Sequence, residues 1–220
     1  MQSRVALALR AALVVVSIAA RAHGQRAAAP CHAGQHASAR RCCADGSEWV
    51  AERRRCTAMP PEEACRHGHT AMCVPAAEAL LAGTDGAIAS QGVQLLRTGC
   101  EAGDAVACRR AGEVLGEGRV VPLDPTGAAA LFDRACTAGE LESCGRLATA
   151  LALGRGVTTD VPRASDLAHR ACARGIAAGC AALSDVADAY ETGRGGTRDA
   201  AHAAAVYREA CDARSGAACL

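Results

Sequence analysis

The chain has 220 residues, of which half are hydrophobic but only 2% aromatic, and its 24 basic and 23 acidic residues give a formal net charge of +1. Every basic residue is arginine, so a P-loop lysine, a Schiff-base lysine and a Ser-x-x-Lys nucleophile are excluded. The near-balance of charge indicates no nucleic-acid partner, and we expect none.

Residues 1–24 have the pattern of a secretory signal peptide. Basic residues precede a mainly apolar run over 11–20, and small residues follow at positions suited to cleavage after Gly24 or after Ala22. The run is shorter than the ~20 residues of a membrane span, which disfavours an uncleaved anchor. A lipid anchor on Cys31 is a further alternative. We expect a periplasmic or secreted protein with no transmembrane span in the mature chain, in a compartment where cysteines form disulfides.

Residues 25–60 are predicted to form a cysteine-rich N-terminal module. It carries Cys31, Cys42, Cys43 and Cys56. Cys42 and Cys43 are neighbours and are not expected to pair with each other, so Cys31 and Cys56 are their expected partners. Four cysteines allow three connectivities, and the pairing within this module stays open.

The other ten cysteines reveal an internal repeat over residues 61–220. They form five pairs whose members lie eight residues apart, and the pairs recur after 35, 36, 36 and 39 residues. A period of this length indicates a solenoid built from repeated helical units. The pairs are Cys65/Cys73, Cys100/Cys108, Cys136/Cys144, Cys172/Cys180 and Cys211/Cys219.

Each repeat is predicted to contain two antiparallel helices. Asp124, Asp160 and Asp199 each lie twelve residues before a first cysteine, where the carboxylate can cap a helix N-terminus. Glycines spaced as Gly-x-Gly are expected to end the preceding helix in the left-handed conformation; they are Gly116/Gly118, Gly154/Gly156 and Gly193/Gly195. The predicted helices span about 66–82, 86–99, 104–116, 124–136, 140–153, 161–173, 176–191 and 199–212.

Two repeats depart from this pattern. In the first, Ile88 stands where the later repeats have the capping aspartate. In the last, the three extra residues fall before Gly193, so the helix from about 176 is predicted to be nearly a turn longer.

The cysteine pairs are predicted to be structural disulfides. A tight turn between helices can bring two such positions within the ~4.4–6.8 Å Cα separation that a disulfide allows. Paired zinc ligands usually have about two to four residues between them, whereas seven intervene here. A bridge across each turn would stabilise a core that is rich in alanine and poor in aromatic residues.

The sequence resembles the Sel-like repeat (SLR) family, and specifically its cysteine-rich secreted branch, the Hcp family. The resemblance covers about residues 62–220 and is carried by the run 153–157 (LGRGV), by the alanine–cysteine pair 171–172 and by single residues at matching spacings. The single residues are Asp160, Ala164, Leu167, Gly175 and Cys180. The resemblance implies an all-α fold, an α/α superhelical solenoid of disulfide-stapled helix pairs related to tetratricopeptide repeats.

Members of this branch are often labelled β-lactamases or penicillin-binding proteins, so hydrolysis of a β-lactam or a peptidoglycan fragment is the alternative function. A metal-dependent mechanism of this kind would need His-x-His-x-Asp, but after His67 and His69 the sequence has Ala71. Cys65, His67, His69 and Cys73 could hold a metal only if the cysteines were reduced. We identify no catalytic, cofactor-binding or metal-binding residue, and predict an interaction scaffold that binds a protein or peptide on a concave helical surface.

Overall fold

The structure is a computed structural model that describes residues 35–38, 41–44, 47–50 and 55–213. Contacts divide the chain into two compact units, and the second, which holds all the described helices, continues from Thr57. The expected signal peptide lies outside the described residues, and so do Cys31 and Cys219, for which disulfides are predicted. None of the described helices is long and apolar enough to cross a membrane.

Four short strands lie in the segment predicted as a cysteine-rich module, and the sequence pattern did not predict them. Strand β1 (Gln35–Ser38) pairs antiparallel with β2 (Arg41–Ala44), with Ser38 opposite Arg41. Strands β3 (Ser47–Val50) and β4 (Arg55–Ala58) form a second two-stranded sheet.

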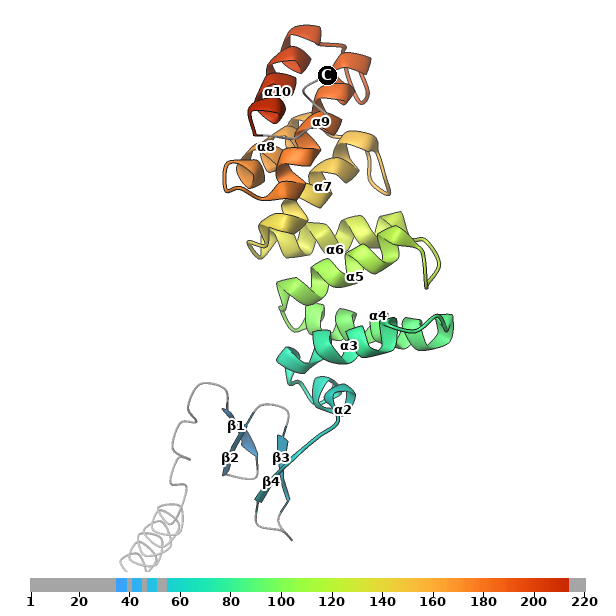
Figure 1. Cartoon of the computed structure of the whole chain (residues 1–220), viewed down its shortest axis with the longest axis vertical. Coiled ribbons are helices and arrows are strands. Elements are labelled where there is room, and N and C mark those ends of the chain that lie inside the picture. The colour runs from blue at the N-terminus through green and yellow to red at the C-terminus, as the bar shows by residue number, and fades with distance from the viewer. Residues whose placement is uncertain (1–34, 39–40, 45–46, 51–54, 214–220) are drawn as a thin grey trace, which may run out of the picture. The chain divides into compact units, whose positions relative to one another are not determined.

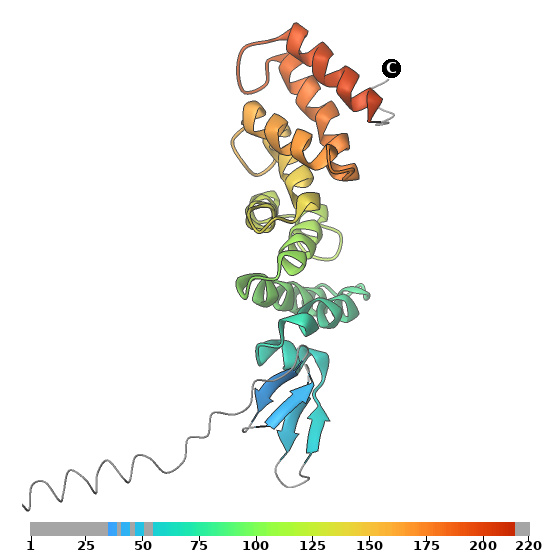
Figure 2. The same cartoon turned by 90° about the vertical axis from the view of Figure 1, so that its left-hand side faces the viewer.

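The helical unit is the predicted solenoid of antiparallel helix pairs, as Figures 1 and 2 show. Neighbouring helices pack on one another from α3 through α10, and α7 also packs on α9. The elements are α2 (Pro61–Arg66), the 3₁₀ turn η1 (Thr70–Met72), α3 (Cys73–Leu81), α4 (Gly86–Glu101), α5 (Ala105–Glu117), α6 (Pro125–Thr137), α7 (Leu141–Leu153), α8 (Val161–Cys172), α9 (Ala177–Thr192) and α10 (Ala200–Asp212).

The predicted signals set the boundaries of these helices. The side chains of Asp124, Asp160 and Asp199 each accept a hydrogen bond from a backbone N–H in the first turn of α6, α8 and α10. Gly154 and Gly193 end α7 and α9 with φ of 70° and 74°, a conformation that glycine adopts without the steric cost of a Cβ. Helix α9 has 16 residues against 13 in α7, which confirms the predicted extra turn.

Three local predictions are wrong. The helix predicted over 66–82 is broken into α2, η1 and α3, because the chain turns at Gly68, whose φ is 91°. The missing cap at Ile88 is replaced three residues earlier by Asp85, which accepts hydrogen bonds from the backbone N–H groups of Ala87 and Ile88.

The third error concerns the first Gly-x-Gly pair. Gly118 is the left-handed residue that ends α5, with φ of 63°, whereas Gly116 lies inside that helix. Counted back from the capping aspartate, Gly118 therefore corresponds to Gly154 and Gly193, and Val120 occupies the place of the second glycine.

The core is built mainly from alanine, as the composition predicts. The largest fully buried side chains are Leu96, Leu147, Leu183 and Val186, and most of the other core positions are alanine or half-cystine. Small side chains let the helices approach closely. The α/α solenoid of disulfide-stapled helix pairs predicted from the resemblance is confirmed for the described helices.

Candidate functional site

Four disulfides connect successive helices of the described chain. They are Cys65–Cys73, Cys100–Cys108, Cys136–Cys144 and Cys172–Cys180, with Cα separations of 4.5–4.7 Å. Cys56 and Cys211 are also disulfide-bonded. The pairing predicted for Cys211 and Cys219, and the pairing of Cys31, Cys42, Cys43 and Cys56, remain predictions.

The histidines noted in the sequence do not converge on a metal site in the described residues. His67 ends α2 and His69 precedes η1, and the Cys65–Cys73 disulfide removes the two thiolates that would complete that ligand set. In the described part of the chain no three potential ligands lie close enough together to hold a metal ion. His169 pairs with Glu209 instead, with 2.6 Å between Nδ1 and Oε1.

The most distinctive feature of the helical unit is a separation between α5 and α7. Helix α7 packs directly against α9, but α5 and α7 hardly touch. Gly145 of α7 explains the first contact, since a Cβ at this position would lie only 2.5 Å from backbone atoms of Ala178 and Gly179. The residue in the same position of α5, directly after the second cysteine of its pair, is Arg109.

Arg109 is too large to allow the same close packing. Its guanidinium contacts Glu113 Oε1 at 2.7 Å through Nη1 and Glu140 Oε1 at 3.5 Å through Nε. Glu140 caps the start of α7 by accepting a hydrogen bond from the Ser143 backbone N–H. The Arg109 side chain thus lies between α5 and α7 and occupies the space that close packing of the two helices would need.

Charged side chains form a ladder of ion pairs across α3, α5 and α7, the helices that each begin at or just before the second cysteine of a bridge. Arg110 Nε of α5 donates to Glu78 Oε1 of α3 at 2.6 Å, and Arg146 Nη2 of α7 lies 2.9 Å from Glu113 Oε1 of α5. Arg110 also pairs with Glu113 within α5. Glu78 and Glu113 stand at the same position of their repeats, five residues after the second cysteine, so the ladder follows the period of the sequence.

The ladder changes at the next repeat. The position of Glu113 is taken there by Thr149, and one repeat later by Asp185. Thr149 Oγ1 donates a hydrogen bond to Asp185 Oδ2 at 2.8 Å, so a hydroxyl–carboxylate hydrogen bond joins α7 to α9 where ion pairs join the earlier helices. The charged part of the ladder therefore ends beside the gap.

Glu113 is the buried centre of the ladder, with 6% of its side chain exposed. Burial alone would raise its pKa. Hydrogen bonds from Arg110 and Arg109, with the charge of Arg146, outweigh burial and lower the pKa of Glu113 below its ordinary value of 4.5. The Glu78 carboxylate, by accepting a hydrogen bond, raises the pKa of Arg110. Glu113 and Arg110 are therefore both ionised at neutral pH.

The gap between α5 and α7 contains a cavity of about 640 Å³. This volume lies within the ~300–1,000 Å³ typical of ligand-binding pockets. Seventeen residues line it, from α5, α6, α7, α9 and two loops, and nine of them are alanine or glycine. The side chains of alanine and glycine are too small to reach across the gap, so the space stays open.

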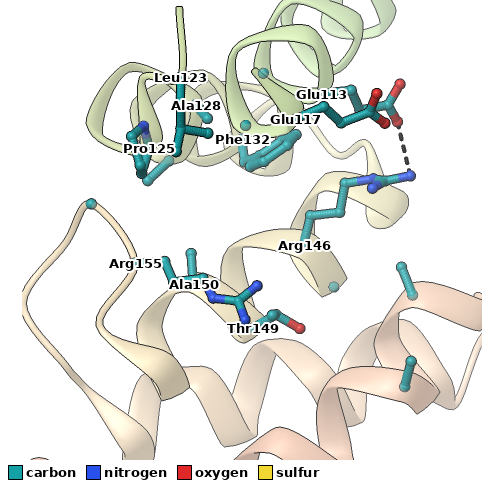
Figure 3. A pocket seen from close by; sticks show the side chains of 17 residues that line it. Glu113, Glu117, Leu123, Pro125, Ala128, Phe132, Arg146, Thr149, Ala150 and Arg155 are labelled. Atoms are coloured by element: carbon teal, nitrogen blue, oxygen red, sulfur yellow. Dashed lines mark ion pairs between the residues drawn. The ribbon is translucent and has the colours of Figure 1, made fainter. Parts of the chain in front are cut away.

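The interior of the cavity is apolar and charged side chains lie at its edges. Phe132 of α6 lies on one wall with Leu123 and Pro125, and Ala150 of α7 lies opposite, as Figure 3 shows. The Phe132 ring also packs against α5, because Gly112 leaves room for it: a Cβ there would come within 2.7 Å of the ring.

Two charged groups on the α7 side of the cavity differ in their partners. The Glu113–Arg146 ion pair closes one end (Figure 3). Arg155, from the loop between α7 and α8, extends its guanidinium beside Thr149 on the opposite part of that wall. Arg155 makes no ion pair with any residue in the described ranges.

The sequence did not predict that any of these residues lines a cavity; Gly116 and Gly156 were noted only as glycines expected to end helices, and Arg155 only as part of the run 153–157. The repeated acidic position of Glu78 and Glu113 was visible in the repeat register and could have been found by aligning the repeats on their second cysteines. The contrast between Arg109 and Gly145 was visible in the same alignment. That the contrast would open a cavity depends on which helices pack together, which the sequence alone does not state.

Comparison with protein families places the repeats. The family model described as Sel1 repeat matches residues 105–140, 141–176 and 177–215, which together are half of the chain. The chain belongs to the Sel1 repeat family. Each Sel1 repeat so defined contains one helix pair, beginning with α5, α7 and α9. Cys136–Cys144 and Cys172–Cys180 therefore join the second helix of one repeat to the first helix of the next.

Solved structures share the fold of these Sel1 repeats. A Sel1 repeat protein from Oxalobacter formigenes is 20% identical with a TM-score of 0.52, over 69% of this chain and 62% of that one. The protein c5321, a protective antigen present in uropathogenic Escherichia coli strains and displaying an SLR fold, is 18% identical with a TM-score of 0.57, over 72% of this chain and 33% of that one. The matched part of this chain thus spans less than two thirds of either protein.

A third structure, the Helicobacter pylori cysteine rich protein B, is 24% identical over 55% of this chain and 86% of that one. Its TM-score of 0.40 is too low to support an argument. Comparison with curated protein sequences finds no match.

Proposed function

We propose that this Sel1 repeat chain is a periplasmic or secreted scaffold that binds a protein or peptide on the face formed by the first helices of its repeats, α3, α5, α7 and α9. The observation that carries the proposal is the cavity between α5 and α7, two of these helices, whose apolar interior lies between charged edges. Protein interfaces commonly have this arrangement, a desolvated apolar centre within a polar rim.

The ladder supports the proposal because it fixes the helices on either side of the cavity. Glu113 binds arginines of α5 and α7 at once, and Arg110 extends the connection to α3. A rigid surface loses less conformational entropy when a partner binds than a mobile one.

The disulfides support the proposed location. They persist in oxidising compartments such as the bacterial periplasm and are rare in the cytosol. The proposed arrangement is a signal peptide over 1–24, a cysteine-rich module over 25–60 and repeats over 61–220, of which the described part holds four disulfides that connect successive helices.

The test is selection of peptides from a random display library on the oxidised protein. Ala150→Phe fills the cavity from its α7 wall and should abolish the enrichment seen with the unmodified protein. Ala130→Phe makes the same change at an exposed position of α6 and should enrich the same peptides. Unchanged helical content of both variants confirms that they fold. Equal enrichment on the unmodified and Ala150→Phe proteins would contradict the proposal.

The enzymatic alternative is examined on the same preparation. Turnover of nitrocefin by the metal-free and zinc-loaded protein tests β-lactam hydrolysis. The cavity supports binding, and no feature of the described residues specifically favours hydrolysis.

A further inference from the structure

We infer that the partner inserts a large apolar side chain into the cavity between α5 and α7 and places an acidic side chain against Arg155. This inference rests on the proposed function and names the chemistry of the segment that the site takes. It follows from the size and lining of the cavity, from its hydrogen-bonding groups and from the charge that its own residues leave unpaired.

The size and lining select the apolar anchor. The walls are mostly alanine and glycine, and Phe132 supplies the one aromatic ring among the lining residues. An aromatic or long aliphatic side chain would fill space that the small wall residues leave open and would contact the Phe132 ring. Such anchors commonly dominate the binding energy of a protein interface.

The hydrogen-bonding groups keep the partner's backbone outside. Thr149 is the only lining side chain with a neutral polar group, and its hydroxyl already donates to Asp185. A peptide backbone inserted into the cavity would lose its hydrogen bonds to water without replacement, which is unfavourable. The cavity therefore suits a side chain projecting from a backbone that stays at the mouth, where Leu123 is exposed.

The loop after α7 fixes where the charged contact forms. Gly156 lies directly against Pro125 at the start of α6, so closely that a Cβ would clash with the proline backbone. The neighbouring Arg155 is thereby held at the edge of the cavity. Its guanidinium lies beside Thr149 (Figure 3).

The pairing of the lining charges selects an acidic neighbour for the anchor. The negative charge of Glu113 is paired with its arginines, one of which, Arg146, lies 2.9 Å away. Glu117 pairs with Arg119 at 3.4 Å. Of the charged residues that line the cavity, Arg155 alone has no ion-pair partner in the described residues. A carboxylate of the partner would complete this pairing, whereas a basic group would be repelled.

The experiment uses the peptides selected on the oxidised full chain. We expect a large apolar residue with Asp or Glu within about two positions of it. Replacing that acid by Lys should weaken binding to the unmodified protein by roughly tenfold, the upper range for a partly exposed charge contact and its reversal. The Arg155→Glu variant should reverse the preference and bind the Lys peptide more tightly than the acidic one.

Arg174→Glu is the matched control. Arg174 is exposed in the turn between α8 and α9 and does not line the cavity. This variant should keep the preference for the acidic peptide. A preference that Arg155→Glu leaves unchanged, or selected peptides with an apolar anchor and no excess of acids, would overturn the inference and leave the proposed function intact. If no peptide prefers the unmodified protein over Ala150→Phe, the proposed function fails and the inference fails with it.

Discussion

Replacing Gly145 by alanine tests whether close backbone contact holds α7 against α9. An added Cβ would lie 2.5 Å from Ala178 and Gly179 backbone atoms, whereas ordinary contacts begin near 3.4 Å, so the helices must separate by about 0.9 Å. Overpacking of this kind costs about 1–3 kcal/mol. The upper part of that range applies because backbone cannot rotate away. The higher helix propensity of alanine offsets about 0.5–1 kcal/mol. We expect a net loss near 2 kcal/mol.

Gly116→Ala is the matched control, since Gly116 also lies within a helix and lines the same cavity. Its added Cβ would meet only Ala128 Cβ, at an ordinary 3.5 Å. This variant should therefore gain about 0.5–1 kcal/mol from helix propensity. Thermal unfolding followed by circular dichroism should place the two variants about 5–12 °C apart. Equal stability of the two variants would refute the packing argument.

Three further predictions concern the ladder, the bridges and the helix ends. Glu113→Gln should lower stability by about 2 kcal/mol at pH 7, because it removes the buried negative charge that Arg109, Arg110 and Arg146 share. Because the folded state lowers the pKa of Glu113, this contribution is complete above its ordinary value of 4.5 and declines as pH falls below it, so denaturant titrations of both proteins should converge in acid. During graded reduction followed by mass spectrometry, Cys172–Cys180 should open before Cys65–Cys73 and Cys100–Cys108, because both of its cysteines are half-buried whereas all four of theirs are fully buried; simultaneous opening would contradict this. Gly154→Val should cost about 1–3 kcal/mol in chemical unfolding, because φ is 70° at that position, and a loss no larger than that of an exposed Ala→Val change would show that the left-handed cap is unimportant.

The helix pairs were predictable because their ends depend on local chemistry. A side-chain carboxylate that caps the first turn and a glycine that ends the last one act within a few residues, and both recur with the cysteines. The errors arose where a local signal had moved. Asp85 took over the capping role from the position of Ile88, and Gly68 broke a helix that the spacing alone extended from 66 to 82.

The cavity was not predictable in the same way because it depends on contacts between repeats. Arg109 and Gly145 occupy one position of the repeat, and each is compatible with a helix. Their effects differ only when the first helix of the following repeat packs against them, because glycine permits close contact between the two helices and arginine prevents it. The burial of Glu113 likewise depends on arginines of two helices. From the sequence alone, Glu113 cannot be distinguished from an exposed acidic residue.

The position of the bridges determines how the chain would respond to proteolysis. A cut in the turn between Cys136 and Cys144 leaves both fragments joined by the disulfide, and the same holds for the other bridged turns. A cut in a loop within a Sel1 repeat, such as 118–124 or 154–160, lies between the four described bridges, none of which spans it, so among these bridges nothing covalent joins the two parts. Resistance to proteases would therefore depend on the loops within repeats, while the turns between repeats could be cleaved without releasing a fragment.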